Sequence, residues 1–122
     1  MPASLVLVLD DDTTFLKTIG ILLADRGFTS LPCSSVAQAI DGLTQNPAAA
    51  IVDLCLEGDG GEKLSNDFVR NHLIPAGLPY VRLTSAPGGV PEDLKGAGVF
   101  DKRDLWYDDD GVMIQIEAAL GL

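Results

Sequence analysis

The chain has 122 residues, of which 47% are hydrophobic and 21% are charged. This length predicts a single domain, residues 1–122, and the composition excludes a disordered chain. Its 18 acidic residues outnumber the 8 basic ones and give a formal net charge of −10. This excess of negative charge argues against direct binding to nucleic acid or to an anionic membrane surface, because both are themselves negatively charged.

Two cysteines, Cys33 and Cys55, are too few for a disulfide framework. Both have apolar neighbours in the sequence, so we interpret them as reduced core thiols. The longest apolar runs, residues 5–9 and 48–52, are far shorter than the roughly 20 residues that span a bilayer, and the N-terminal residues lack the regions of a signal peptide. We therefore expect a cytoplasmic protein with no membrane segment.

In the first half of the chain, apolar runs alternate with helical patterns. Three runs predict strands, the first and third of them buried on both faces: residues 5–9, 28–33 and 48–55. Two helical patterns lie between them, each with apolar residues at steps of three and four. Asp12 or Thr13 can cap the first helix, which should stop at Gly27, and Ser34 or Ser35 can cap the second.

The second half continues the alternation less regularly. Residues 62–73 predict a third helix with Leu64, Phe68 and Val69 turned inward, and residues 112–120 predict a final helix. Residues 80–83 and 98–101 predict a fourth and a short fifth strand. Residues 85–91 are rich in proline and glycine, which leaves only residues 92–95 as a helical turn. The fourth helix should therefore be short or absent.

The alternation of strands and helices implies parallel β–α–β units. The predicted fold class is α/β, with a doubly wound parallel sheet of five strands and helices on both of its faces. Ligands of such sheets bind outside the carboxyl ends of the strands. The residues that directly follow each apolar run are therefore the candidates for function.

Charged and hydroxyl side chains follow four of the five predicted strands. Asp10, Asp11 and Asp12 follow the first strand, Asp53 the third, Thr84 the fourth and Lys102 the fifth. Carboxylates gathered at one edge repel one another unless a cation neutralises them, and Mg²⁺ prefers such oxygen ligands. Mg²⁺, a lysine and an additional carboxylate that acts as nucleophile suit phosphoryl transfer.

With these motifs the chain resembles the receiver domain of bacterial two-component response regulators. Residues 6–12 resemble the opening strand and acidic pair of that family, with Asp10 and Asp11 at the paired positions. Residues 53–61 resemble its phosphoacceptor segment, residues 79–84 its fourth strand, and residues 100–102 carry the matching lysine. The resemblance implies the CheY-like, flavodoxin-like (βα)5 fold with strand order 2-1-3-4-5.

The resemblance also implies a mechanism and partners. Asp53 would accept a phosphoryl group from the phosphohistidine of a sensor histidine kinase or of a phosphotransfer protein. Mg²⁺ would be held by Asp10, Asp11, Asp53 and the backbone carbonyl of Cys55. Lys102 would pair with the phosphoryl group, and Thr84 would move to hydrogen-bond it and carry the signal to the surface. The further partners that the resemblance implies are a downstream protein target and a second copy of the chain in a homodimer. Such a domain is not an enzyme beyond its own phosphorylation and autodephosphorylation.

The chain departs from the family pattern along the expected route to the output surface. Arg103 rather than proline follows Lys102, so a trans peptide bond is expected there. Val99 stands at the position of the aromatic switch residue, while Phe100 should face the other side of its strand. Lys102 stands only 18 positions after Thr84, and Glu57 replaces a frequent proline. The phosphorylation site therefore matches the family, whereas the output route differs.

Two other functions are consistent with the sequence. Residues 10–14 also resemble the D-x-D-x-T motif of haloacid-dehalogenase-type phosphatases, with Asp10 as nucleophile and Asp12 as acid/base. The altered output route also allows a pseudo-receiver, which binds proteins without being phosphorylated.

Two features stand nearer the C-terminus. The aromatic pair Trp106 and Tyr107 indicates either a partner contact or packing against the sheet edge. The acidic residues 108–110 indicate the start of a helix.

Overall fold

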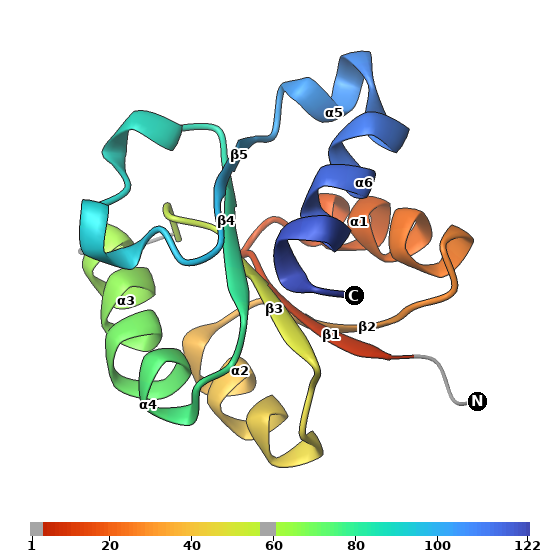
Figure 1. The fold of residues 1–122 in the computed structure, drawn as a ribbon. Coiled ribbons are helices and arrows are strands. Elements are labelled where there is room, and N and C mark those ends of the chain that lie inside the picture. The colour runs from red at the N-terminus through yellow and green to blue at the C-terminus, as the bar shows by residue number, and fades with distance from the viewer. Residues whose placement is uncertain (1–3, 57–60) are drawn as a thin grey trace.

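The computed structural model describes residues 4–56 and 61–122. Its centre is a parallel sheet with the strand order β2-β1-β3-β4-β5 (Figure 1). The strands are Leu5–Leu9 (β1), Thr29–Cys33 (β2), Ala49–Val52 (β3), Tyr80–Thr84 (β4) and Val99–Asp101 (β5). The predicted fold class and strand order are therefore confirmed.

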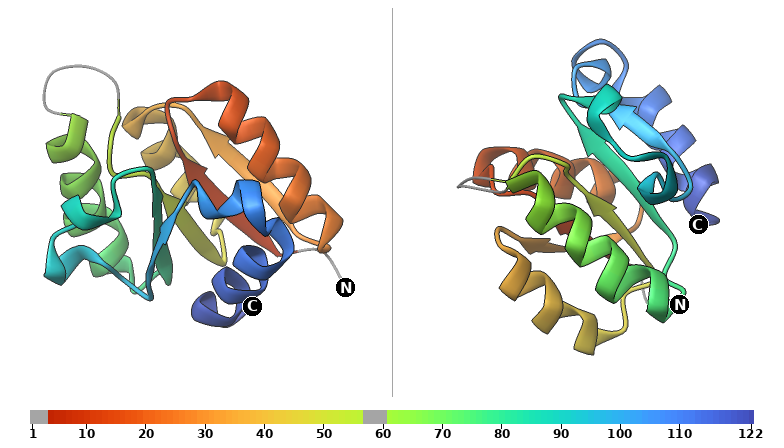
Figure 2. Two further views of the ribbon diagram at one scale, coloured as in Figure 1. Left: turned by 90° about the horizontal axis from the view of Figure 1, so that it is seen from above. Right: turned by 90° about the vertical axis from the view of Figure 1, so that its left-hand side faces the viewer.

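Helices cover both faces of this sheet. Figures 1 and 2 show α1 (Thr13–Asp25) and α6 (Asp109–Leu120) on one face, and α2 (Val36–Gly42) and α3 (Gly61–Phe68) on the other. The chain continues from α3 through a π-helical segment, Val69–Leu73, into α4 (Ile74–Ala76). Asp12 caps α1 and Ser35 caps α2, as their side-chain types predict. Within the described residues, no helix has the length and apolar character needed to cross a membrane.

The packing of β1 explains why apolar and polar residues do not alternate along its sequence. Val6 and Val8 belong to the core cluster under α1 and α6, whereas Leu7 and Leu9 belong to the cluster under α2 and α3. Because successive side chains of a strand point to opposite faces, a strand covered on both faces needs apolar residues at every position. The two apolar clusters hold the sheet between its helices, and so they set the positions of the strand ends that carry the polar side chains.

The connection between β4 and β5 lacks an α-helix. Two short 3-10 turns, Pro87–Gly89 and Glu92–Leu94, stand in its place. This agrees with the expectation of a short or absent fourth helix, because proline and glycine interrupt the helical hydrogen-bond pattern. The connection returns close to the sheet at Gly96, where φ is +62°. A Cβ added at this residue would lie 2.5 Å from the main-chain carbonyl oxygen of Tyr80.

Several predicted boundaries and contacts were wrong. The strand β3 ends at Val52 rather than at residue 55, so Asp53 already lies beyond the strand. Leu64 is 46% exposed rather than turned inward, because the buried stripe of α3 runs along Gly61, Ser65 and Phe68 instead. The sequence reading also missed the short helix α5 (Asp104–Tyr107) and placed the start of α6 three residues too late.

Candidate functional site

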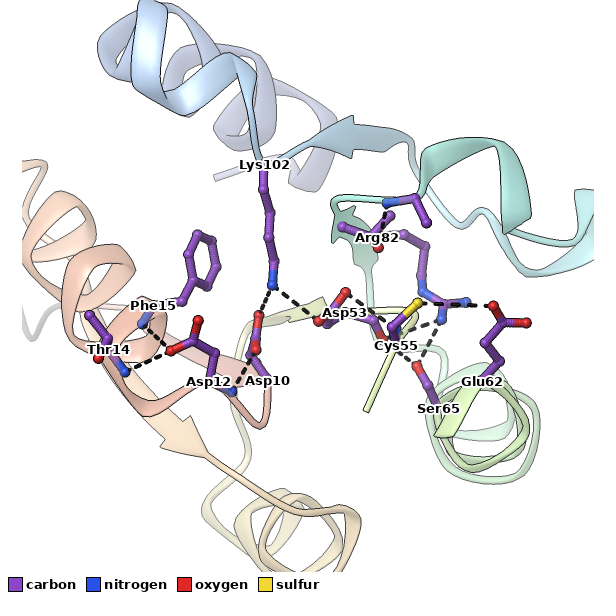
Figure 3. Close-up of polar contacts among 12 residues, drawn as sticks. Asp10, Asp12, Thr14, Phe15, Asp53, Cys55, Glu62, Ser65, Arg82 and Lys102 are labelled. Carbon is purple, nitrogen blue, oxygen red and sulfur yellow. Dashed lines mark hydrogen bonds and ion pairs between the residues drawn. The ribbon is translucent and has the colours of Figure 1, made fainter. Parts of the chain in front are cut away.

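The site lies at the carboxyl edge of the sheet, where β1 and β3 end next to each other and β5 ends one strand further along, beyond β4. Asp10 follows β1, Asp53 follows β3 and Lys102 follows β5 (Figure 3). The Lys102 Nζ lies 2.5 Å from the Asp10 Oδ2 and 3.1 Å from the Asp53 Oδ2. One ammonium thus bridges two carboxylates that are far apart in the sequence.

Asp11 completes an acidic cluster with these two carboxylates. Carboxylate oxygens of Asp10, Asp11 and Asp53 all lie within 4.8 Å of one another, with Asp10 and Asp53 buried and Asp11 half-buried. Three such oxygen donors fit a divalent cation of the Mg²⁺ type. Lys102 supplies only one positive charge against the three carboxylates, so the cluster favours a further cation.

The protein environment perturbs the protonation of this cluster. Burial raises the pKa of Asp10 to about 6, although its hydrogen bond with Lys102 opposes that rise. Burial also opposes the charge of Lys102, but the hydrogen bond to Asp10 and the nearby negative charges outweigh it and raise the pKa of Lys102. The Lys102 ammonium also lies 4.3 Å from the centre of the Phe15 ring, which adds a cation–π contact. Lys102 is therefore held as a cation.

Backbone hydrogen bonds orient the acidic side chains. The amide of Asp12 donates to the Asp10 Oδ1 at 2.9 Å. The Asp12 carboxylate in turn accepts from the amides of Thr14 and Phe15 at 3.0 and 3.1 Å, as the N-cap of α1. The amide of Asp53 donates to the Leu9 carbonyl at 2.9 Å, which places this residue as an extension of the sheet. The start of α1 and the end of β1 thus fix the cluster together.

Thr84 lies one step away from the acidic cluster. Its side chain is buried at the end of β4, and its hydroxyl accepts a hydrogen bond from the Ala86 amide at 3.1 Å. The amide of Lys102 donates to the main-chain carbonyl of Thr84 at 3.0 Å. The structure therefore brings Asp10, Asp11, Asp53 and Lys102 together, with Thr84 connected to Lys102 through the main chain.

The two cysteines occupy different environments. Cys33 is buried, as expected. Cys55 is exposed, so the interpretation of a core thiol was wrong for this residue. The reason is that β3 ends before it, and Cys55 lies in the loop at the edge of the site. Burial of part of the residue still raises the pKa of the Cys55 thiol.

Residues 57–60 of the expected phosphoacceptor segment lie outside the described residues.

Sequence reasoning missed two buried polar residues beside Asp53. Arg82 is fully buried in the middle of β4, and its guanidinium donates to the Ser65 Oγ at 2.8 Å. The Ser65 hydroxyl donates to the main-chain carbonyl of Asp53. A signal was present in the sequence, because Arg82 is a single charged residue inside the apolar run of the fourth strand.

The segment around Lys102 confirms some expectations and corrects one. The Lys102–Arg103 peptide is trans, and Phe100 packs on the core cluster under α1 and α6. Trp106 and Tyr107 are 81% and 89% exposed, so packing against the sheet edge was the wrong interpretation. Trp106 lines a groove of about 340 Å³ that also includes Phe15, Lys102 and Leu105.

Comparisons with known proteins agree with this geometry. No protein-family model matches the chain. In structure, the chain resembles a sensor protein from Polaromonas sp. JS666, with a TM-score of 0.78, 23% identity and 98% of each chain covered. It also resembles a CheY-like response regulator receiver domain protein from Methanospirillum hungatei, with a TM-score of 0.64, 16% identity and coverage of 95% and 98%. This chain has the fold of a CheY-like response regulator receiver domain.

Curated proteins that resemble this chain in sequence agree with the structural comparison. The transcriptional regulatory proteins GlrR of Escherichia coli K12 and QseF of Escherichia coli O157:H7 are each 30% identical to the chain over 122 residues. The match covers 98% of the chain but only 26% of each relative. The chain therefore spans about a quarter of the length of the transcriptional regulatory proteins that it matches. The resemblance to CheY-like receiver domains that the sequence indicated is confirmed by the similarity of the folds.

Proposed function

We propose that residues 1–122 form a receiver domain that accepts a phosphoryl group on Asp53 from a protein phosphohistidine. The observation that carries this proposal is the shared contact of Lys102 with the carboxylates of Asp10 and Asp53 at the carboxyl edge of the sheet. A carboxylate nucleophile beside a fixed ammonium and two further acids is suited to phosphoryl transfer. The receiver-like fold and the curated relatives support the same function.

In the proposed transfer, a carboxylate oxygen of Asp53 forms a bond to phosphorus while the bond from phosphorus to the donor histidine nitrogen breaks. That nitrogen keeps the electron pair of the broken bond. Lys102, which already contacts Asp53 at 3.1 Å, would pair with an oxygen of the transferred group. Water later hydrolyses the acyl phosphate, so the domain turns over only its own phosphoryl group and is not an enzyme for a separate substrate.

The acidic cluster suits the Mg²⁺ ion that such a transfer uses. Asp10, Asp11 and Asp53 would hold the ion through carboxylate oxygens, together with the backbone carbonyl of Cys55. When bound, Mg²⁺ neutralises negative charge on the phosphoryl oxygens. The cluster favours this ion because it carries three carboxylates against one ammonium.

The proposed partners are a sensor histidine kinase or a phosphotransfer protein as donor, and a downstream protein as target. The groove between α1 and α5 supports a donor contact, because it opens beside Lys102 and has the exposed Trp106 at its rim. Exposed aromatic side chains are common anchors in protein interfaces. Thr84 would carry the change at Asp53 to the surface through the connection between β4 and β5.

The structure favours this proposal over the phosphatase alternative. In that alternative Asp12 acts as acid/base, but its carboxylate is engaged as the N-cap of α1 by two backbone amides. Asp53 would also have no role, although it lies in the same cluster as Asp10. The pseudo-receiver alternative differs only in whether Asp53 takes up phosphate, which experiment decides.

The test is incubation of the chain with Mg²⁺ and acetyl phosphate, followed by intact-mass measurement. We expect one added phosphoryl group that is stable in acid and labile in base, and we expect Asp53→Asn to abolish it. Loss of the adduct in Asp10→Asn but not in Asp53→Asn would support the phosphatase alternative. Absence of any adduct, also with a phosphorylated histidine kinase as donor, would support the pseudo-receiver.

A further inference from the structure

Arg82 is a charged residue in the interior of the sheet. Its side chain is fully buried among the residues under α3, and burial lowers its pKa from the usual range. In the part of the chain that the structure describes, no carboxylate forms an ion pair with it, and its Nε has no hydrogen-bond partner. Burying an arginine without a carboxylate partner costs desolvation free energy. The groups that surround Arg82 should therefore indicate the function of its positive charge.

Those neighbours are the backbone of the acceptor site and the connection between β4 and β5. One terminal nitrogen of Arg82 donates to the Ser65 Oγ at 2.8 Å and lies 3.5 Å from the main-chain oxygen of Asp53. The other donates to the Asn66 Oδ1 at 3.1 Å and to the Leu94 carbonyl at 3.2 Å. The planar fork of the guanidinium therefore joins Asp53, α3 and the second 3-10 turn in one network.

Ser65 strengthens the link to Asp53. Its hydroxyl accepts from Arg82 and donates to the Asp53 carbonyl, so the same main-chain oxygen is held by two groups. The Asp53 carboxylate is held on the opposite side by Lys102. Two cations thus contact the acceptor residue: Arg82 contacts its main-chain carbonyl and Lys102 contacts its carboxylate (Figure 3).

Charge balance gives Arg82 a second role at the same site. Asp10, Asp11 and Asp53 carry three negative charges, and Lys102 and Arg82 together carry two positive ones. Phosphorylation of Asp53 adds about one further negative charge, which a nearby buried cation stabilises more strongly than an exposed one. The same cation repels a divalent metal ion in the cluster, so it should favour the phosphoryl group and weaken the binding of Mg²⁺.

We propose that Arg82 is a positioning residue for phosphoryl transfer, which fixes the main chain of Asp53 and supplies a buried positive charge beneath the acceptor. This inference rests on the proposed function of Asp53. It assigns a role to a strand residue that makes no contact with the carboxylate of Asp53 and acts through Ser65 and the main chain.

The test compares two readouts in the variant Arg82→Met. We expect its rate of phosphorylation by acetyl phosphate to fall by at least about tenfold, the factor that one lost charge-assisted hydrogen bond gives. We expect its Mg²⁺ affinity, measured by calorimetric titration without phosphodonor, to rise by about threefold or more, because the buried positive charge is gone. A purely structural defect would weaken both, so the opposite directions identify the role.

Two further variants keep the test decisive. Arg82→Lys retains the charge but loses the fork, so its Mg²⁺ affinity should match the wild type while phosphorylation stays slow. Arg82→Gln, which is neutral and keeps an amide donor, replaces Arg82→Met if circular dichroism shows that the methionine variant does not fold. The matched control is Arg70→Met, which removes an exposed arginine paired with Asp67 and should change neither readout by more than about twofold.

The outcomes separate this inference from the proposed function. A phosphorylated wild-type chain whose Arg82 variants behave like Arg70→Met would overturn the role of Arg82 alone. Parallel losses of phosphorylation and Mg²⁺ affinity would also overturn it, since they indicate damage to the fold. A wild-type chain that takes no phosphoryl group would overturn the proposed function and the positioning role, whereas the Mg²⁺ titrations would still decide whether Arg82 acts on the acidic cluster.

Discussion

Replacing Asp10 by asparagine should stabilise the metal-free protein, and the gain should depend on pH. Burial raises the pKa of Asp10 from its ordinary 3.8 to about 6 in the folded chain. Between these pH values the folded state binds more protons than the unfolded state, so the free energy of unfolding falls as the pH rises. The total fall corresponds to about 3 kcal/mol and is complete above about pH 6.

The variant Asp10→Asn lacks this titration. Its free energy of unfolding should therefore increase relative to the wild type by up to about 3 kcal/mol between about pH 4 and pH 7. Because the pKa of Asp10 already includes its hydrogen bond with Lys102, no separate correction for the lost ion pair is needed in this difference. Urea unfolding followed by circular dichroism in EDTA measures it at each pH.

Controls make this measurement specific to the buried carboxylate. Asp93→Asn removes an exposed carboxylate and should follow the wild type across the whole range to within about 0.5 kcal/mol. Saturating Mg²⁺ should reduce the gain in the free energy of unfolding that Asp10→Asn produces. The reason is that the wild type binds the ion more tightly than the variant and is therefore stabilised more by it. A difference between Asp10→Asn and the wild type that stays constant, or shrinks as the pH rises, would refute the reasoning.

Three other predictions test separate parts of the structure. Asp11→Ala should lower Mg²⁺ affinity by at least about tenfold in a calorimetric titration, because it removes one of three oxygen donors; an unchanged affinity would contradict the ligand assignment. Asp12→Ala should lower the free energy of unfolding by about 1 kcal/mol through loss of the α1 cap, and no loss would show that the cap is dispensable. Gly96→Ala should cost more than Gly77→Ala in the same urea assay: both residues have a left-handed φ, but only at Gly96 would the Cβ meet Tyr80. Equal costs would contradict the close approach.

Most of the fold could be predicted from the sequence because its strands are covered on both faces. The run Leu5–Leu9 needs apolar residues at every position, and such a run is visible without coordinates. The helix caps were visible to within one residue, since Asp12 or Thr13 and Ser34 or Ser35 can each satisfy free amides, and the structure selects Asp12 and Ser35. The helix α5 was missed because four residues are too few to show a helical period.

The candidate site was predictable in its carboxylates and lysine, but not in the residues around them. Asp10, Asp53 and Lys102 follow strands, and parallel strands end at one edge of the sheet. The exposure of Cys55 depended on where β3 stops, and three residues of error moved that side chain from the expected core to the surface. The burial of Arg82 depended on hydrogen bonds to α3 and to the turn at Leu94, far away in the sequence.

The sequence by itself determined where the five strands and the longer helices lie, to within a few residues, and which polar groups stand at the strand ends, because periodicity and capping are local properties of the chain. Only the tertiary structure decided how close those groups lie. The distance of 2.5 Å between Lys102 and Asp10, and the clamp of Arg82 on the main chain of Asp53, join segments that are far apart in the sequence. Burial also raised the pKa of Asp10, since desolvation depends on everything packed around a group and not on its neighbours along the chain.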